Sequence, residues 1–150
     1  MISFDSNVLV YAADERAGTR HDQAVDLIER AIESGNCIQP LQSLGEFFNA
    51  VTRKIGTSPM VAAAFVEGWL AVIPIEAANT SDLVHAMRAV REHELTFWDA
   101  LLWATVRRAG VGLLISEDFH FQDGRTIEGV RIANPFVTRN AALIDRTLPR

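Results

Sequence analysis

The sequence contains little of several residue types, and each scarcity excludes a class of protein. Cys37 is the only cysteine among 150 residues, so no disulfide can form within the chain, and we expect a reducing cytoplasmic environment. Five prolines and 49% hydrophobic residues differ from the composition of a disordered chain. No apolar run approaches the roughly 18 residues that a membrane span needs, and no signal-peptide pattern is present. We therefore expect a soluble cytoplasmic protein with no membrane partner.

Lysine is almost absent, since Lys54 is the only one and every other basic residue is arginine. Arginine suits paired contacts with phosphate or carboxylate groups. The net charge of −5 and the pI near 5.3 disfavour the non-specific nucleic-acid binding that depends on phosphate neutralisation. A few clustered carboxylates that bind cations can account for most of a negative net charge. The net charge therefore does not decide which kind of partner the protein binds.

No repeat, low-complexity tract or flexible linker divides the sequence, so residues 1–150 are predicted to form a single domain. Short apolar segments alternate with amphipathic helical patterns, which predicts a three-layer α/β/α domain around a mainly parallel sheet of about four to five strands. The first predicted strand ends at Asp5, and the others cover 37–39, 72–75, 112–116 and 130–133. The predicted helices follow Asp5 and cover 21–32, 43–54, 59–70, 79–93, 97–108 and 139–146.

Four carboxylates stand in strongly apolar surroundings. Asp5 and Asp118 directly follow predicted strands, whereas Glu46 and Asp99 stand near the starts of two apolar helices. In a parallel α/β domain, the carboxyl ends of strands and the starts of helices share one edge of the sheet. The four acids are therefore expected to converge on one crevice.

Each acid also has a purely structural interpretation. Asp5 is a good helix N-cap. Ser43 and Glu46 match the spacing of a capping box, and Thr96 and Asp99 nearly match it. Taken singly, Glu46 and Asp99 fit helix caps better than metal ligands, and Asp118 would only close a turn.

The combination of the four acids favours a cation site. Two unit charges about 5 Å apart repel by roughly 3 kcal/mol at an effective dielectric constant near 20, so convergence without a cation is unfavourable. Carboxylate oxygens suit magnesium or manganese. The four histidines show no metal-ligand spacing, and the chain has no glycine-rich phosphate loop.

The order of these acidic segments resembles the PIN-domain family, and specifically the VapC-type ribonuclease toxins of bacterial toxin–antitoxin pairs. Residues 4–12 are similar to the first motif of that family, 42–47 to the second, 98–104 to the third and 114–118 to the fourth. The run 129–136 resembles the C-terminal strand of one VapC branch. No single motif is specific, but four in this order at this length form a strong pattern.

The resemblance implies a role for each matched residue. Asp5, Glu46, Asp99 and Asp118 would form the catalytic site, and three of them, Asp5, Asp99 and Asp118, would bind the metal. The supporting residues would be Asn7, which orients a ligand or water, together with Ser43 and Glu117. Because the fourth acid varies in register within the family, Glu117 is an alternative to Asp118.

The activity implied by the resemblance is magnesium-dependent endoribonucleolytic cleavage of RNA, with manganese as a second candidate ion. The resemblance also implies a cognate antitoxin that covers the site, and a homodimer.

Two other functions remain open from the sequence. A haloacid-dehalogenase-like phosphatase also begins with an acid after its first strand, but it needs a second aspartate where this chain has Asn7, and its lysine would have to be Lys54. A non-catalytic RNA-binding or partner-binding module could keep the fold, although the presence of all four acids argues against it.

Overall fold

Short strands alternate with helices along the residues that the computed structural model describes, 1–119 and 123–148. The strands are β1 (Ile2–Phe4), β2 (Gln39–Pro40), β3 (Ile75–Glu76), β4 (Leu113–Ile115), β5 (Thr126–Ile127) and β6 (Val130–Ala133). The helices are α1 (Ser6–Ala13), α2 (Thr19–Ser34), α3 (Leu41–Ala50), α4 (Pro59–Val72), α5 (Thr80–His93), α6 (Phe97–Arg108) and α7 (Ala141–Thr147). A π-helical turn, Val51–Ile55, continues α3, and two short 3-10 turns, Glu15–Ala17 and Thr138–Asn140, precede α2 and α7.

The sheet is mainly parallel, as predicted. Its four hydrogen-bonded strands have the order β1-β4-β6-β5, and β1, β4 and β6 run parallel while β5 is antiparallel to β6. In this register Phe4 lies beside Ile115, and Ile115 lies beside Ala133. β2 and β3 form a second parallel pair, which a bridge between Ile2 and Cys37 connects to β1. The carboxyl ends of β1 and β4 are therefore neighbours.

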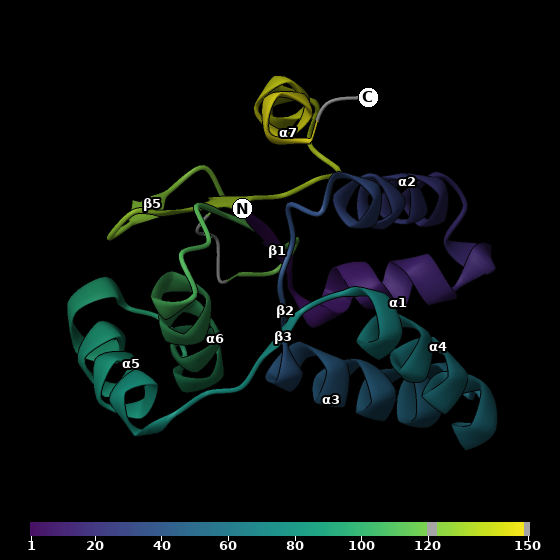
Figure 1. The fold of residues 1–150 in the computed structure, drawn as a ribbon, viewed down its shortest axis with the longest axis horizontal. Helices are drawn as coiled ribbons and strands as arrows, with labels where there is room; N and C mark the ends of the chain where they lie inside the picture. Colours follow the sequence, from purple (N-terminus) through teal and green to yellow (C-terminus); the bar gives the residue numbers. More distant parts are fainter. Residues whose placement is uncertain (120–122, 149–150) are drawn as a thin grey trace.

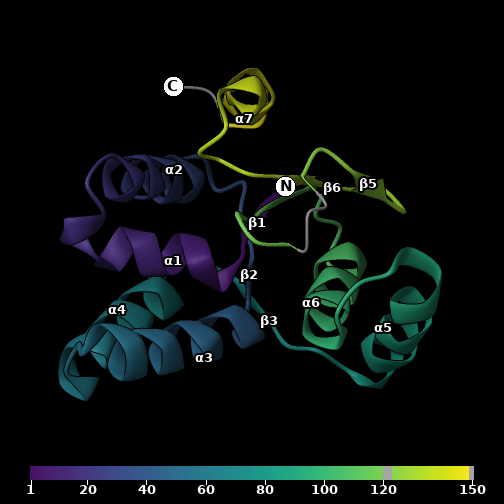
Figure 2. The ribbon, with the colours of Figure 1, turned by 180° about the vertical axis from the view of Figure 1, so that it is seen from behind.

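Helices cover the strands from both sides, which gives the predicted three layers. Figures 1 and 2 place α1–α4 together on one side of β1 and β2, and α5 and α6 together on the other side. One apolar cluster includes β1 with residues of α1–α4 and α7, and a second includes residues of α5, α6 and β6. Both faces of β1 and β4 are thus covered, which explains why every residue of these two strands is buried. None of the helices in the described part of the chain has the length and apolarity that a membrane crossing requires.

Several element boundaries differ from the sequence prediction, for example β2, which begins at Gln39 rather than at Cys37. α3 begins at Leu41 with Pro40 at its N-cap, so Ser43 lies inside the first turn and caps nothing. The predicted strand 72–75 is wrong in its first three residues, because Val72 ends α4 and only Ile75 belongs to a strand. An apolar run that directly follows an apolar helix does not reveal by itself where the helix stops.

The hairpin of β5 and β6 was missed in the sequence. Its turn is formed by Glu128 and Gly129, both with positive φ, 44° and 91°. A two-residue turn that needs positive φ twice usually has asparagine or aspartate before the glycine. Glutamate gives no such signal, and a two-residue edge strand is too short for a recognisable alternation.

Candidate active site

A pocket of about 410 Å³ opens beyond the carboxyl ends of β1 and β4, with lining residues on α1, α3 and α6. Five of its lining residues are acids: Asp5, Glu46, Asp99, Glu117 and Asp118. The structure therefore brings together all four acids that the sequence singled out, with Glu117 beside them. The sheet topology is the cause, because it places the ends of β1 and β4, the first turn of α6 and the beginning of α3 at one edge, and Glu46 follows in the second turn of α3.

Asp5 is the most enclosed of these acids, with 7% of its surface exposed. It caps α1, since one carboxylate oxygen accepts a hydrogen bond from the Ser6 amide at 2.7 Å, and the other accepts one from the Ser116 hydroxyl at 2.7 Å. Burial is the main cause that raises the pKa of Asp5 from 3.8 to about 6, because the hydrogen bonds from Ser116 and Ser6 only partly compensate. The negative charges of Glu46 and Asp99 also raise it. Asp5 is thus both the N-cap of α1 and a member of the acidic cluster.

Glu46 projects from α3 and is held at both carboxylate oxygens. Oε2 accepts from the Ser6 hydroxyl at 3.2 Å, and Oε1 accepts from the Gln42 amide at 2.7 Å. The same amide group donates to the Trp98 carbonyl at 3.0 Å, one residue before Asp99. Gln42 therefore ties α3 to the start of α6, a link that sequence reasoning missed.

Asp99 lies in the first turn of α6, and its backbone amide donates to the Thr96 hydroxyl at 3.4 Å. Thr96 is therefore the N-cap that the sequence predicted, while the Asp99 side chain lines the pocket. Ser43 does not reach the pocket. Its hydroxyl is buried in α3 without a hydrogen-bond partner among the described residues, so its predicted supporting role has no basis in the structure.

Asn7 connects Asp5 to the segment that follows β4. Its amide nitrogen donates to Asp5 Oδ2 at 3.1 Å and to the Ser116 hydroxyl at 3.2 Å, while its carbonyl oxygen accepts from the Glu117 amide at 3.2 Å. Asn7 therefore orients the Asp5 carboxylate. Ser116 was not singled out in the sequence, although its place at the end of the most apolar strand, next to β1, was the available signal.

Glu117 and Asp118 have different surroundings. The Tyr11 hydroxyl donates to Glu117 Oε2 at 2.6 Å, and Arg20 forms an ion pair with Oε1. The Arg20 guanidinium also lies over the rings of Tyr11 and Phe136, at 5.3 and 5.2 Å from their centroids. Glu117 is thus fixed and largely neutralised by its neighbours, whereas Asp118 is exposed at the pocket. This arrangement favours Asp118 over Glu117 as the fourth acid.

The pocket has the donor atoms that a hard divalent cation prefers. Its described lining offers five carboxylates and no histidine or cysteine, which is the oxygen-rich set that suits magnesium or manganese. Burial, and to a smaller extent the negative charges of Glu46 and Asp99, raise the pKa of Asp5, and a bound cation would favour its ionised form. The residues present therefore fit a magnesium or manganese ion.

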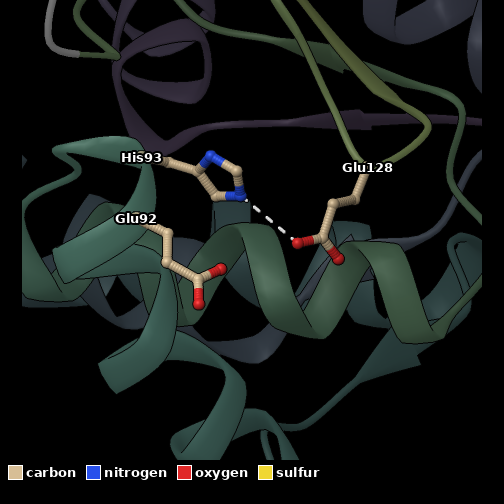
Figure 3. A group of neighbouring side chains, drawn as sticks. All are labelled: Glu92, His93 and Glu128. Carbon is tan, nitrogen blue, oxygen red and sulfur yellow. Dashed lines mark hydrogen bonds and ion pairs between the residues drawn. The ribbon is translucent and has the colours of Figure 1, made fainter.

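A second group of possible ligands, Glu92, His93 and Glu128, lies where the end of α5 meets the β5–β6 turn (Figure 3). His93 Nε2 is 3.2 Å from Glu128 Oε1, but the same carboxylate also receives Arg88 at 2.8 Å and Arg107 at 2.9 Å. Burial alone would raise the pKa of Glu128, but the His93 hydrogen bond and the two arginines lower it. A metal ion would have to displace both guanidinium groups, so this group is an ion-pair cluster that stabilises the hairpin turn.

Comparisons with known proteins agree with this architecture. The family model of the PIN domain matches residues 2–125. The crystal structure of VapC20 from Mycobacterium tuberculosis, described as a sarcin-ricin loop cleaving toxin, has a similar fold with a TM-score of 0.64. It is 21% identical in sequence, and the match covers 85% of this chain and 98% of that one. No curated protein matches the chain. Because the family model spans most of the sequence and includes every acid of the pocket, the chain belongs to the PIN-domain family.

Proposed function

We propose that this PIN-domain chain is a magnesium-dependent endoribonuclease and the toxin of a VapC-type toxin–antitoxin pair. The observation that carries the proposal is the convergence of Asp5, Glu46, Asp99 and Asp118 in one open pocket. The fold shared with a toxin that cleaves the sarcin-ricin loop supports RNA as the substrate class. Manganese has the same preference for oxygen ligands and would serve as an alternative ion.

In this proposal Asp5, Asp99 and Asp118 hold the ion. When bound, the ion lowers the pKa of a coordinated water and stabilises the charge that develops on the phosphate. Asn7 and Ser116 orient Asp5, each through a hydrogen bond to Oδ2. Because Asp5 must be ionised to bind a cation and its metal-free pKa is about 6, metal affinity should fall as the pH drops below about 6.

Glu46 has the position of a proton acceptor. Its carboxylate lines the pocket, and the hydrogen bonds from Ser6 and Gln42 restrict its orientation. In the proposed reaction one of its oxygens accepts the proton of the attacking water. Glu117, fixed by Tyr11 and Arg20, would hold the rim of the pocket in place without binding the ion.

A cognate antitoxin is the proposed protein partner. α3 carries Glu46 toward the acidic pocket, and a different face of the same helix lines an apolar groove of about 470 Å³ against α4, with Leu41, Phe48 and Leu70 exposed along it. An antitoxin segment with apolar side chains for the groove and an arginine for the carboxylates would complement both features. A homodimer is proposed from the family resemblance alone.

The test compares Asp99→Asn with the wild type and with Asp22→Asn. Asp22 is also an acid in the first turn of its helix, but it is exposed on α2 and is absent from the pocket lining. We expect Asp99→Asn to lose cleavage of a synthetic sarcin-ricin-loop RNA and of total bacterial RNA, together with growth inhibition, while circular dichroism remains native-like. Asp22→Asn should cleave like the wild type.

Two outcomes would contradict the proposal. Cleavage by Asp99→Asn at the wild-type rate would show that Asp99 is only part of the helix start. A folded wild-type protein that cleaves no RNA with magnesium or manganese would favour the non-catalytic alternative.

A further inference from the structure

The acidic pocket creates an electrostatic problem for the proposed substrate. A phosphodiester is an anion, and five carboxylates line the space that it must approach. A bound divalent ion offsets part of this charge, but the phosphates on either side of the cleaved one still face acids. A cation in the lining would reduce this repulsion, and among the described lining residues Lys54 is the only one that carries a positive charge.

The π-helical turn after α3 accounts for the position of Lys54. In a regular α-helix, residues eight apart point about 80° away from each other and lie about 12 Å apart along the axis. The wider turn of Val51–Ile55 has more residues per turn, so each residue rotates by less. Glu46, Ala50 and Lys54 consequently all line the same pocket. The turn ends at Gly56, whose φ of 81° reverses the chain, and π-helical turns occur frequently at functional sites.

Lys54 is also available for a ligand. Its side chain is exposed and makes no hydrogen bond or ion pair with another residue in the described part of the chain. Arg20, which contacts the lining residues Glu117 and Tyr11, is already bound to both of them. Lys54 lies in the turn after α3, about two helical turns from Glu46, so a phosphate bound by Lys54 would flank the phosphate held at the acids.

We propose that Lys54 binds a backbone phosphate of the RNA that flanks the cleaved phosphodiester, and that it thereby positions the strand along α3. This inference rests on the proposed nuclease function and deepens it. Lysine acts on phosphate as a point charge, so the contact carries no sequence preference. Lys54 is a positioning residue, and its loss should affect RNA binding more than the chemical step.

The first experiment measures binding of a short fluorescein-labelled single-stranded RNA by anisotropy, in magnesium and on the Asp99→Asn background to prevent cleavage. Lys54→Met should weaken binding by about tenfold at low salt. It should also reduce the slope of log affinity against log salt concentration by about 0.7. The ratio of wild-type-residue affinity to Lys54→Met affinity should therefore fall about 2.6-fold for each fourfold rise in salt concentration.

Two variants serve as controls in this experiment. Lys54→Arg keeps the charge and should restore binding. Arg53→Met removes the same charge one residue away on the same turn, but Arg53 is not part of the pocket lining, so it should change affinity less than twofold. With cleavage-competent protein, Lys54→Met should raise KM about tenfold and leave kcat within about twofold.

The second experiment needs no substitution at residue 54. Because Lys54 is the only lysine, an amine-acylating reagent modifies one side chain besides the N-terminus, and mass spectrometry can follow it in a single peptide. RNA should protect Lys54 from acylation, whereas added salt should remove the protection.

The outcomes separate the two proposals. If the wild type binds and cleaves RNA but Lys54→Met keeps its salt slope, or RNA leaves the acylation of Lys54 unchanged, the role of Lys54 is overturned and the nuclease proposal stands. If the wild type neither binds nor cleaves RNA, the proposed function itself is overturned. A loss of slope together with protection of Lys54 supports the inference.

Discussion

Replacing Asp5 with asparagine should stabilise the metal-free protein at neutral pH, although Asp5 is central to the proposed site. Burial raises the pKa of this carboxyl from 3.8 to about 6. Each pKa unit corresponds to about 1.4 kcal/mol, so ionised Asp5 reduces the free energy of unfolding by about 3 kcal/mol. The folded state binds the extra proton between pH 3.8 and about 6, so the penalty is absent below this window and complete above it.

Asparagine has nearly the same shape as aspartate but carries no charge. Its carbonyl oxygen can still accept the hydrogen bond from the Ser6 amide, and the Ser116 hydroxyl can accept from its nitrogen. The Asn7 amide nitrogen, which donates to Asp5 Oδ2 at 3.1 Å, would then face a second donor. Losing that hydrogen bond costs about 1 kcal/mol. The net gain for metal-free Asp5→Asn at pH 7 is therefore about 2 kcal/mol, or about 4–8 °C in Tm.

The assay is a series of thermal melts between pH 4 and 8, with a chelator and with manganese, on the wild type, Asp5→Asn and the control Asp22→Asn. The advantage of Asp5→Asn should disappear as the pH falls toward 4, because wild-type Asp5 becomes protonated. Manganese at ten times its Kd should stabilise the wild type by about 1.4 kcal/mol and the variant much less. A variant that melts below the wild type at pH 7 with chelator, or a Tm difference that does not change with pH, would refute the burial argument.

Two further predictions concern the ion pairs and the partner. Asp82→Asn should destabilise the protein by about 3 kcal/mol in urea unfolding at pH 7, because the 1% exposed Asp82 side chain pairs with Arg108. Burial opposes ionisation of Asp82, but Arg108 lowers the pKa of this carboxyl below its ordinary value of 3.8. The ion pair therefore stabilises the fold above pH 3.8, and this stabilisation is lost as the pH falls below that value. Equal free energies of unfolding for Asp82→Asn and the wild type at pH 7 would contradict this prediction. Separately, the antitoxin and manganese should compete for the toxin in calorimetric titrations, since an arginine would take the place of the metal between the carboxylates. Independent binding would count against that interface.

Strong local patterns were sufficient to predict much of this protein. Residues 97–108 form α6 and residues 130–133 form β6 with the predicted bounds. Thr96 caps α6 and Gly110 follows its end, whereas β6 lies between Gly129 and the turn-forming Asn134 and Pro135. The convergence of the four acids was also predictable. In a parallel sheet the chain direction alone places strand ends and helix starts at one edge, so no knowledge of side-chain packing was needed.

Only the tertiary structure decided how the residues around those acids divide their roles. The contacts from Asn7 to Ser116 and Glu117, and from Arg20 to Glu117, join residues about a hundred positions apart, and local spacing contains no signal for them. The register of β1 against β4 brings Ser116 to Asp5, and the packing of α1 against α2 brings Arg20 to Glu117. The π-helical turn directs Lys54 into the pocket, because a smaller rotation per residue, accumulated over several residues, alters which face a side chain occupies.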